Sequence, residues 1–307
     1  MQLGFGLSLT GQMKGGTAAP PAFDPASLFA SGEEGAWYEP SPETAFLSTT
    51  NLTPCDVGDS CGFLLDKSQG AGYSGGAFTG LGSELVTNGD FETGDLTGWE
   101  NSGGDFVYDS GFVRDTGTTG TVFRQQLATQ AGKLYKVEFD YVASPSNGTP
   151  SLSWEGSRTF YATDWGSLGS RPVVYLRATQ DNSYFGFEGR IAVNWAVDNI
   201  SVKELPGNHA TQVTADARPI LRQTAGGLYY LEDDEVNDVL NWTAPADTDY
   251  TISYVNTAGT VTTLTGQSLS GATNILLDPA IVGYVAVDRA LTAGETTDLE
   301  SYLEGLT

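Results

Sequence analysis

Short segments of alternating apolar and polar residues are the feature that most limits how this chain of 307 residues can fold. Residues 135–141 read Tyr-Lys-Val-Glu-Phe-Asp-Tyr, and residues 191–197 read Ile-Ala-Val-Asn-Trp-Ala-Val. A period of two places apolar side chains on one face of a β-strand. Residues 173–178 and 184–188 are two further strand candidates. Since Gly, Asn, Ser and Pro fill the intervals, the pattern predicts a sandwich or jelly roll instead of alternating strands and helices.

Glycine supports the same interpretation. The chain has 39 glycines in 307 residues, about one in eight, against a usual share of roughly 7%. These glycines follow no three-residue period, which excludes collagen, and they suit tight turns between short strands. Apolar residues make up 39% and charged residues 17%, which is enough apolar side chain for packed cores.

The chain divides into three predicted regions. Residues 1–82 show little periodicity and begin with glycines spaced by small and apolar residues, so we expect an extended arm and linker that order against another surface. Residues 83–205 carry the alternating strands. In residues 206–307, a hairpin pattern spans 250–264, and a capping box at 292–295 precedes a helical apolar spacing. The expected fold class is mainly β: an arm, a central jelly-roll sandwich, and a small C-terminal β-rich unit ending in a short helix.

The charge balance excludes several partners. The chain has 14 Lys and Arg and 38 Asp and Glu, which gives a net charge of −24. Such a surface repels nucleic acid and anionic lipid, and it suits divalent cations or neutral ligands such as glycans. In most acidic proteins, however, the acidity only maintains solubility. The longest unbroken apolar stretch, residues 280–287, is too short for a membrane span. We also predict no secretion signal, because the first residues lack a basic leader and a cleavage site.

The few cysteines and histidines argue against an enzyme. Cys55 and Cys61 can form a small disulfide loop or remain two thiols. Together with His209, the single histidine, they cannot supply the four ligands of a zinc site. His209 lies in a turn-like segment, where we expect it to be satisfied or exposed and not catalytic. No P-loop, dinucleotide fingerprint or metalloprotease motif is present, so we predict no enzymatic activity.

The middle region carries a resemblance to a known family. Residues 86–92 read Val-Thr-Asn-Gly-Asp-Phe-Glu, residues 94–99 read Gly-Asp-Leu-Thr-Gly-Trp, and residues 197–202 read Val-Asp-Asn-Ile-Ser-Val. This opening and ending resemble the carbohydrate-binding modules that accompany cellulases and xylanases. The resemblance implies a galactose-binding-like jelly roll in which Phe91 and Trp99 belong to the core.

The same resemblance implies a structural calcium that bridges the first and last strands. The positions that match are Asn88, Asp90, Glu92 and Asp198. Calcium takes six to eight oxygen ligands, which carboxylates and turn carbonyls supply. The alternative is that these carboxylates bind turn amides without metal. The alternation slips at Asp198 and Asn199, and the resemblance implies that these two residues turn the last strand.

A sugar site needs aromatic platforms beside groups that bind hydroxyls. The segment 153–165 is the candidate, because it holds Trp154, Arg158, Tyr161, Asp164 and Trp165 within thirteen residues. The competing interpretation places the large aromatic residues of this segment in the core, where most aromatic residues of β domains lie.

The flanking regions resemble structural proteins of tailed bacteriophages and prophages, often with an inserted carbohydrate-binding-like module. The segments that carry this resemblance are 28–41, 62–68, 205–221, 227–234 and 285–295. It implies a structural virion protein, a tail fibre or other receptor-binding surface appendage. The alternatives are a head fibre or capsid decoration protein, and a secreted bacterial carbohydrate-binding module.

In this interpretation the N-terminal arm docks into the particle. Its apolar residues Leu3, Phe5, Leu7 and Leu9 order on assembly. Ordering costs roughly 1–2 kcal/mol per residue, so the contact is expected to be large or repeated in a homo-oligomer. The expected partners are other virion proteins of the tail, baseplate or capsid, together with host surface glycans. The expected location is the virion, made in the host cytoplasm and released by lysis.

Overall fold

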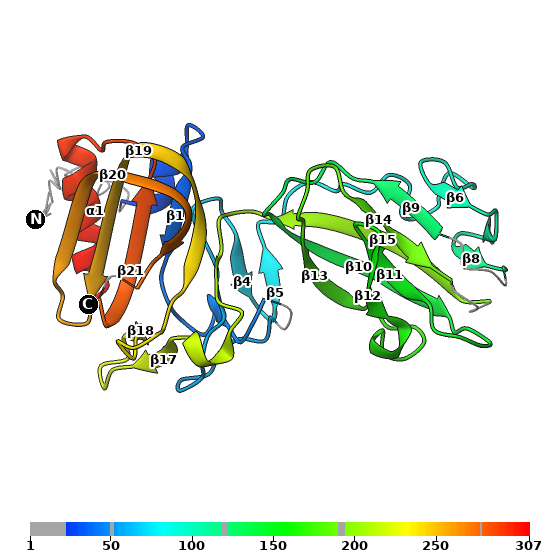
Figure 1. Ribbon diagram of the computed structural model, residues 1–307, viewed down its shortest axis with the longest axis horizontal. Helices are drawn as coiled ribbons and strands as arrows, with labels where there is room; N and C mark the ends of the chain where they lie inside the picture. Colours follow the sequence, from blue (N-terminus) through cyan, green and yellow to red (C-terminus); the bar gives the residue numbers. More distant parts are fainter. Residues whose placement is uncertain (1–22, 50–51, 118–121, 190–193, 277) are drawn as a thin grey trace, which may run out of the picture.

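The computed structural model describes residues 23–49, 52–117, 122–189, 194–276 and 278–307. The fold is mainly β, as expected, with one α-helix among the described residues. Two lobes lie along the long axis in Figure 1. We call the lobe built from residues 83–205 the central sandwich, and the lobe built from residues 23–82 and 206–307 the N/C unit.

Two five-stranded antiparallel sheets form the central sandwich. The first has the order β13 (Val173–Arg177), β10 (Leu134–Ala143), β15 (Ala196–Leu205), β8 (Val113–Asp115) and β7 (Phe106–Tyr108). The second has the order β12 (Ser157–Tyr161), β11 (Ser151–Trp154), β14 (Tyr184–Glu188), β9 (Val122–Gln126) and β6 (Glu100–Ser102). The segments predicted at 135–141, 173–178 and 184–188 therefore form strands of these sheets. Of the segment predicted at 191–197, Ala196 and Val197 lie in β15, residues 194 and 195 precede it, and residues 191–193 lie outside the described residues.

Aromatic side chains fill the space between the two sheets. Phe91 and Trp99 belong to this core, which confirms the prediction for both. The rings of Trp99 and Phe123 stack with centroids 4.4 Å apart, and Trp165 meets Phe139 edge-on at 5.0 Å. Burial of side chains this large is the main source of stability of such a sandwich.

The last strand bulges where the alternation slips. β15 continues through Asp198 and Asn199, so the prediction that these residues turn the strand is wrong. The register with β10 shifts between the pairs Asp140–Asp198 and Glu138–Ser201. Asn199 has φ of +48°, a left-handed conformation that Asn tolerates better than most residues. The extra residue of the bulge therefore accounts for the slip in the pattern.

A nine-stranded sheet forms the N/C unit. Its main path has the order β17 (Ile220–Gln223), β18 (Tyr229–Glu232), β21 (Ala280–Val287), β19 (Asn241–Asn256), β16 (Ala210–Thr211), β3 (Phe63–Leu64) and β2 (Ala45–Phe46). Off this path, β1 (Gly35–Tyr38) pairs with β21, and β20 (Val261–Asn274) pairs with β19. The hairpin predicted at 250–264 is thus confirmed as part of a longer β19–β20 ribbon.

Residues 23–82 are not a free arm, which corrects the prediction for this part of the first region. β1 pairs with β21 from Gly35–Val287 to Tyr38–Tyr284, and β3 pairs with β16. A 3-10 helix, η1 (Pro25–Phe29), adds Leu28 and Phe29 to the same core as β21. The apolar side chains of this segment are therefore buried against residues 206–307 of the same chain.

The predicted terminal helix is present as α1 (Ala293–Glu304). Its capping box is complete: Thr292 Oγ1 accepts from the Glu295 amide, and the Glu295 carboxylate accepts from the Thr292 amide. Leu299 and Leu303 pack against β21 residues such as Val285, so the helix covers one face of the sheet (Figure 1).

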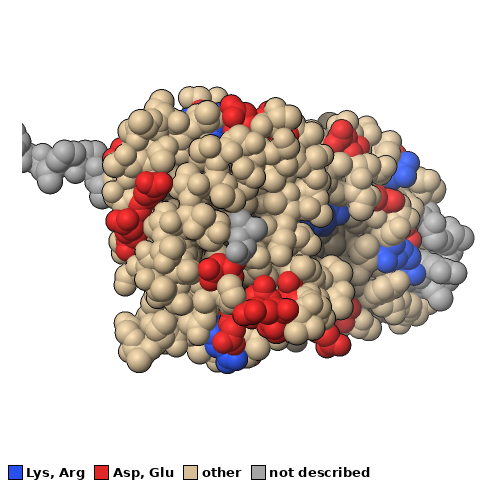
Figure 2. Space-filling view, turned by 60° about the vertical axis from the view of Figure 1, so that its left-hand side comes forward, with Lys and Arg blue, Asp and Glu red and all other residues tan. Residues whose placement is uncertain are grey.

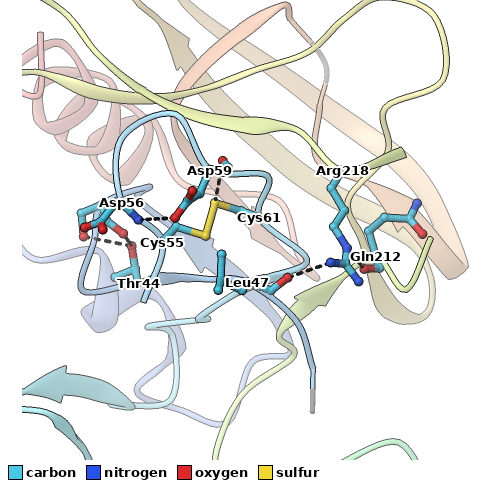
Figure 3. The surroundings of a disulfide bond; sticks show 9 residues. Thr44, Leu47, Cys55, Asp56, Asp59, Cys61, Gln212 and Arg218 are labelled. Atoms are coloured by element: carbon cyan, nitrogen blue, oxygen red, sulfur yellow. Dashed lines mark hydrogen bonds between the residues drawn. A yellow bond between two sulfur atoms is a disulfide. The ribbon is translucent and has the colours of Figure 1, made fainter. Parts of the chain in front are cut away.

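The disulfide that sequence left open is formed between Cys55 and Cys61 (Figure 3). Backbone hydrogen bonds join the closed loop to the segment around β17: the Gly58 amide donates to the Leu221 carbonyl at 2.7 Å, and the Leu221 amide donates to the Asp59 carbonyl at 2.9 Å. The loop is thus part of the N/C unit's edge.

The chain leaves and rejoins the N/C unit at adjacent points. The Gly82 amide donates to the Glu204 carbonyl at 2.9 Å, so the two connecting segments lie side by side. The hairpin of β4 (Gly72–Ser74) and β5 (Ala77–Thr79) lies between the lobes in Figure 1. Phe78 of this hairpin meets Tyr175 of the sandwich edge-on at 5.3 Å. Phe46, Phe63 and Phe78 also share a buried apolar cluster with Leu134 and Leu205, so the lobes are joined by a common apolar contact.

Acidic residues outnumber basic ones in the chain, 38 to 14. Figure 2 shows Asp and Glu in several groups on one face, with few Lys and Arg. None of the helices in the described ranges has the length and apolar character needed to cross a bilayer.

Candidate functional site

The two tryptophans of the predicted sugar site are core residues. Trp154 and Trp165 are 4% and 1% exposed and lie between the sheets. The indole N–H of Trp154 donates to the Arg177 carbonyl, and that of Trp165 donates to the Phe160 carbonyl. Neither ring offers a face to solvent, so the prediction that they serve as sugar platforms is wrong. The segment alone could not show which side chains point inward.

The other three predicted residues lie at the surface. Tyr161 is 40% exposed at the end of β12, and Asp164 is exposed in the short helix η2 (Ala162–Asp164). The Arg158 guanidinium lies 5.1 Å from the centre of the Tyr161 ring and 3.4 Å from the Glu188 carboxylate. Arg158 Nε also donates to Ser151 Oγ at 2.6 Å. Arginine, tyrosine and glutamate thus form one surface group.

A second group of the same composition lies across the sheet, and sequence reasoning missed it. The Arg124 guanidinium lies 4.1 Å from the centre of the Tyr184 ring and 2.8 Å from the Glu100 carboxylate. The Tyr184 hydroxyl is 3.4 Å from the same carboxylate. The three residues come from β9, β14 and β6, and only the pairing of these strands brings them together.

The arginines of the two groups lie in one row of paired residues that runs across the strands. Arg158 faces Ser153, Ser153 faces Gly186, and Gly186 faces Arg124. Paired residues of antiparallel strands point to the same face, and three steps of about 4.8 Å separate the two arginines by about 14 Å. Small residues lie between them. We call this outer face of the second sheet the Arg–Tyr face; its members are Glu100, Arg124, Ser151, Ser153, Arg158, Tyr161, Tyr184, Gly186 and Glu188. Among them Ser151, Ser153 and Gly186 are buried, so the longer side chains form the accessible part of the face.

The Arg–Tyr face suits a neutral, hydroxyl-rich ligand. Each arginine is balanced by a glutamate, so the face carries donors and acceptors without a large net charge. Guanidinium N–H groups donate to hydroxyl oxygens, carboxylates accept from hydroxyl hydrogens, and tyrosine rings contact the apolar side of a sugar.

The predicted calcium residues are only partly brought together. Burial is the main factor that raises the pKa of Asp198, and the charges of Asp140, Asp90 and Glu92 raise it further. No three carboxylates of this group offer oxygens within 4.8 Å of one another in the part of the chain that the structure describes. Asn88 donates through Nδ2 to two turn carbonyls, while its buried Oδ1 has no partner among the described residues.

A tighter acidic group lies in the N/C unit at Asp233, Asp234 and Asp238. Its carboxylates already have partners. Asp234 Oδ1 accepts from the amides of Val236, Asn237 and Asp238, and Asp238 Oδ2 accepts from the Asp234 amide. These hydrogen bonds all lie within residues 234–238, so the carboxylates of Asp234 and Asp238 are already engaged in a surface turn.

His209 is a satisfied structural residue, as expected. It is 4% exposed; its Nδ1 accepts from the Asp66 amide at 3.1 Å, and its Nε2 lies 3.0 Å from the Leu205 carbonyl. Burial lowers the pKa of His209 to about 3, so the ring is neutral near pH 7. This histidine has neither the access nor the protonation behaviour of a general base.

The comparisons with known proteins add little. No family model matches the chain, and no curated protein matches it. Among solved structures, the chain is similar to the CBM35 from Paenibacillus barcinonensis, with 16% sequence identity and a TM-score of 0.28. That similarity covers 35% of this chain and 94% of the other. The residues predicted to dock, Leu3, Phe5, Leu7 and Leu9, lie outside the described residues.

Proposed function

We propose that the protein is a non-catalytic binding protein whose central sandwich holds glycans on the Arg–Tyr face. The observation that carries this proposal is the single row in which Arg158 and Arg124, each beside a tyrosine and a glutamate, flank Ser153 and Gly186. The net charge of −24 disfavours polyanionic ligands, whereas a neutral oligosaccharide has no charge to be repelled.

Binding by one such exposed face is expected to be weak, because solvent competes for every hydroxyl. Several copies of the chain in one assembly convert weak contacts into firm attachment. We therefore propose a homo-oligomer and host surface glycans as the target.

A glycan array followed by titration calorimetry on the full chain tests this proposal. We expect Tyr161→Ala and Tyr184→Ala each to weaken binding at least tenfold. Tyr108→Ala is the matched control, because Tyr108 is 38% exposed on β7 of the opposite sheet. Absence of binding to every glycan, or equal loss in the control, would contradict the proposal. Melting temperatures of the variants separate lost binding from lost folding.

We further propose that the protein is a structural component of a tailed-phage virion, a tail fibre or other surface appendage. The support is the sequence resemblance of its flanking segments. In this proposal residues 1–22 dock against tail, baseplate or capsid proteins, and the protein reaches the particle inside the host before lysis. Full occupancy of particles by a chain lacking residues 1–22 would exclude that docking role. Electron microscopy of labelled particles distinguishes a tail fibre from a head fibre or capsid decoration protein, and recovery in the medium without lysis favours a secreted module.

A structural calcium beside Asp90, Glu92 and Asp198 is also proposed. Two observations support it: the charges of Asp90 and Glu92 raise the pKa of Asp198, and the buried Asn88 Oδ1 has no partner among the described residues. A calcium ion would offset the repulsion between the carboxylates and would accept Asn88 Oδ1 as an oxygen ligand. Melting temperature with calcium and with chelator tests it. An unchanged melting temperature, in the full chain and in Asp198→Asn alike, excludes the metal.

A further inference from the structure

A cavity of about 250 Å³ lies where the central sandwich meets the N/C unit. Lys133 and Arg177 reach it from the sandwich, at the start of β10 and the end of β13. Asn208 and His209 reach it from the connecting segment, and Asn241 and Thr243 reach it from β19. The cavity is therefore built jointly by both lobes.

In the part of the chain that the structure describes, neither cation of this cavity is paired with a carboxylate. Lys133 Nζ donates to Asn208 Oδ1 at 3.2 Å, and Arg177 Nη1 donates to the Gly132 carbonyl. Arg177 Nη2 is buried and has no hydrogen-bond partner among the described residues. A buried guanidinium N–H without an acceptor costs free energy, because water no longer satisfies it.

Ion pairs hold eight of the twelve Lys and Arg that the structure describes, and Lys133 and Arg177 are among the four that have none, although the chain has 38 acidic residues and 14 basic ones. Within the described ranges, neither Lys133 nor Arg177 has a carboxylate oxygen within 4.0 Å. Glu34, which also borders the cavity, is solvent-exposed and pairs with neither cation. Acidity elsewhere on the surface therefore does not neutralise this position.

The charges of both cations act on the same space. Burial is the main reason that the pKa of His209 falls to about 3, and the charges of Arg177 and Lys133 lower it further. The neutral imidazole adds no charge of its own near pH 7. The cavity therefore presents two positive groups among neutral amide and hydroxyl side chains, with the exposed Glu34 as the acidic residue of its lining.

We propose that this cavity binds the oxyanion of a small molecule, a carboxylate or a phosphate monoester, on a body about the size of a monosaccharide. The guanidinium fork matches two oxygens of such a group, and the lysine ammonium supplies a second point charge. A volume of about 250 Å³ equals about eight waters at roughly 30 Å³ each, which sets the size. Because both lobes line the cavity, the bound anion links them. This site is separate from the Arg–Tyr face and does not depend on it.

Calorimetry on the full chain at pH 7 tests the proposal with three probes that share one body: glucose, glucuronate and glucose 1-phosphate. We expect at least one anion to bind saturably and glucose to show no binding at the same concentration. Arg177→Gln and Lys133→Gln each weaken that binding at least tenfold. Lys203→Gln is the matched control, because Lys203 is a half-buried lysine of β15 without an ion pair among the described residues, and it leaves binding unchanged.

The probe that binds identifies the oxyanion. Binding by glucuronate alone assigns a carboxylate, and binding by glucose 1-phosphate alone assigns a phosphate. Saturable binding of neither anion overturns the proposal, as does glucose binding equal to that of the anions. It is also overturned if the folded Arg177→Gln and Lys133→Gln proteins bind like the parent. If Arg177→Gln fails to fold, Lys133→Gln decides, because Lys133 gives up only one hydrogen bond to a neutral amide.

Discussion

Opening the disulfide between Cys55 and Cys61 is expected to destabilise the N/C unit by about 2 kcal/mol. The cross-link closes a loop of seven residues, with a sequence separation of 6. Chain-entropy arguments for a loop of that length give about 8 cal/mol/K, or about 2 kcal/mol at 25 °C, through restriction of the unfolded chain. The native loop has its own anchors, since Gly58 and Asp59 exchange backbone hydrogen bonds with Leu221. Reduction is therefore expected to lower stability without changing the folded structure.

Urea unfolding of the oxidised and reduced protein measures this difference, and hydrogen exchange locates it. Amides of the loop and of β17 are expected to exchange faster after reduction, whereas amides of β10 in the sandwich do not change. The variant C55A/C61A provides the control, because reductant has no bond to break in it. A difference below about 0.5 kcal/mol between oxidised and reduced protein, or an equal effect of reductant on the variant, refutes the entropic reasoning.

Three further perturbations have expected outcomes. Burial raises the pKa of Asp115 to about 6 from its ordinary 3.8, so the stability that its proton confers is complete below about pH 4 and is lost as pH rises through 6. Urea unfolding at pH 4 and at pH 7 measures this: compared with Asp115→Asn, the parent should lose up to about 3 kcal/mol of unfolding free energy between the two pH values. A difference between the two proteins that does not change with pH contradicts this. Thr292→Ala removes the cap of α1 and should cost about 1 kcal/mol by thermal unfolding, whereas Thr297→Ala inside the helix costs clearly less. Trp165→Ala should cost about 3–5 kcal/mol as a core truncation, against less than about 1 kcal/mol for exposed Tyr161→Ala; similar values for both would place Trp165 outside the core.

Sequence reasoning worked where a strand is long and half-buried. β10 and β15 each span ten residues, long enough for a period of two to be visible and even for the bulge at Asn199 to appear as a slip in the pattern. The helix α1 was predictable from its capping box, which begins at Thr292. In both cases the decisive information lies within a few neighbouring residues.

It failed where structure depends on distant partners. β1, β2 and β3 have only two to four residues, so no period can show in them. β1 finds β21 about 250 residues later, and without that partner the segment resembles an arm. Local composition could not reveal this burial.

The candidate site shows the same limit. Arg158 and Tyr161 were found because they are three residues apart on one strand. Arg124 and Tyr184 are sixty residues apart and meet only through the pairing of β9 with β14. Trp154 was misplaced because adjacent strand residues point to opposite faces, and composition alone does not reveal which face is internal.

The hydrogen bond between Gly82 and Glu204 shows that the two chain segments that connect the sandwich to the N/C unit lie next to each other. Both ends of the sandwich meet at one place outside the nine-stranded sheet, so an exchange of residues 83–205 interrupts no strand of that sheet. A replacement must still cover Phe46, Phe63 and Phe78, which now share a buried cluster with Leu134 and Leu205. One replacement of coding sequence at this point exchanges the whole sandwich and leaves the strands of the N/C unit unchanged.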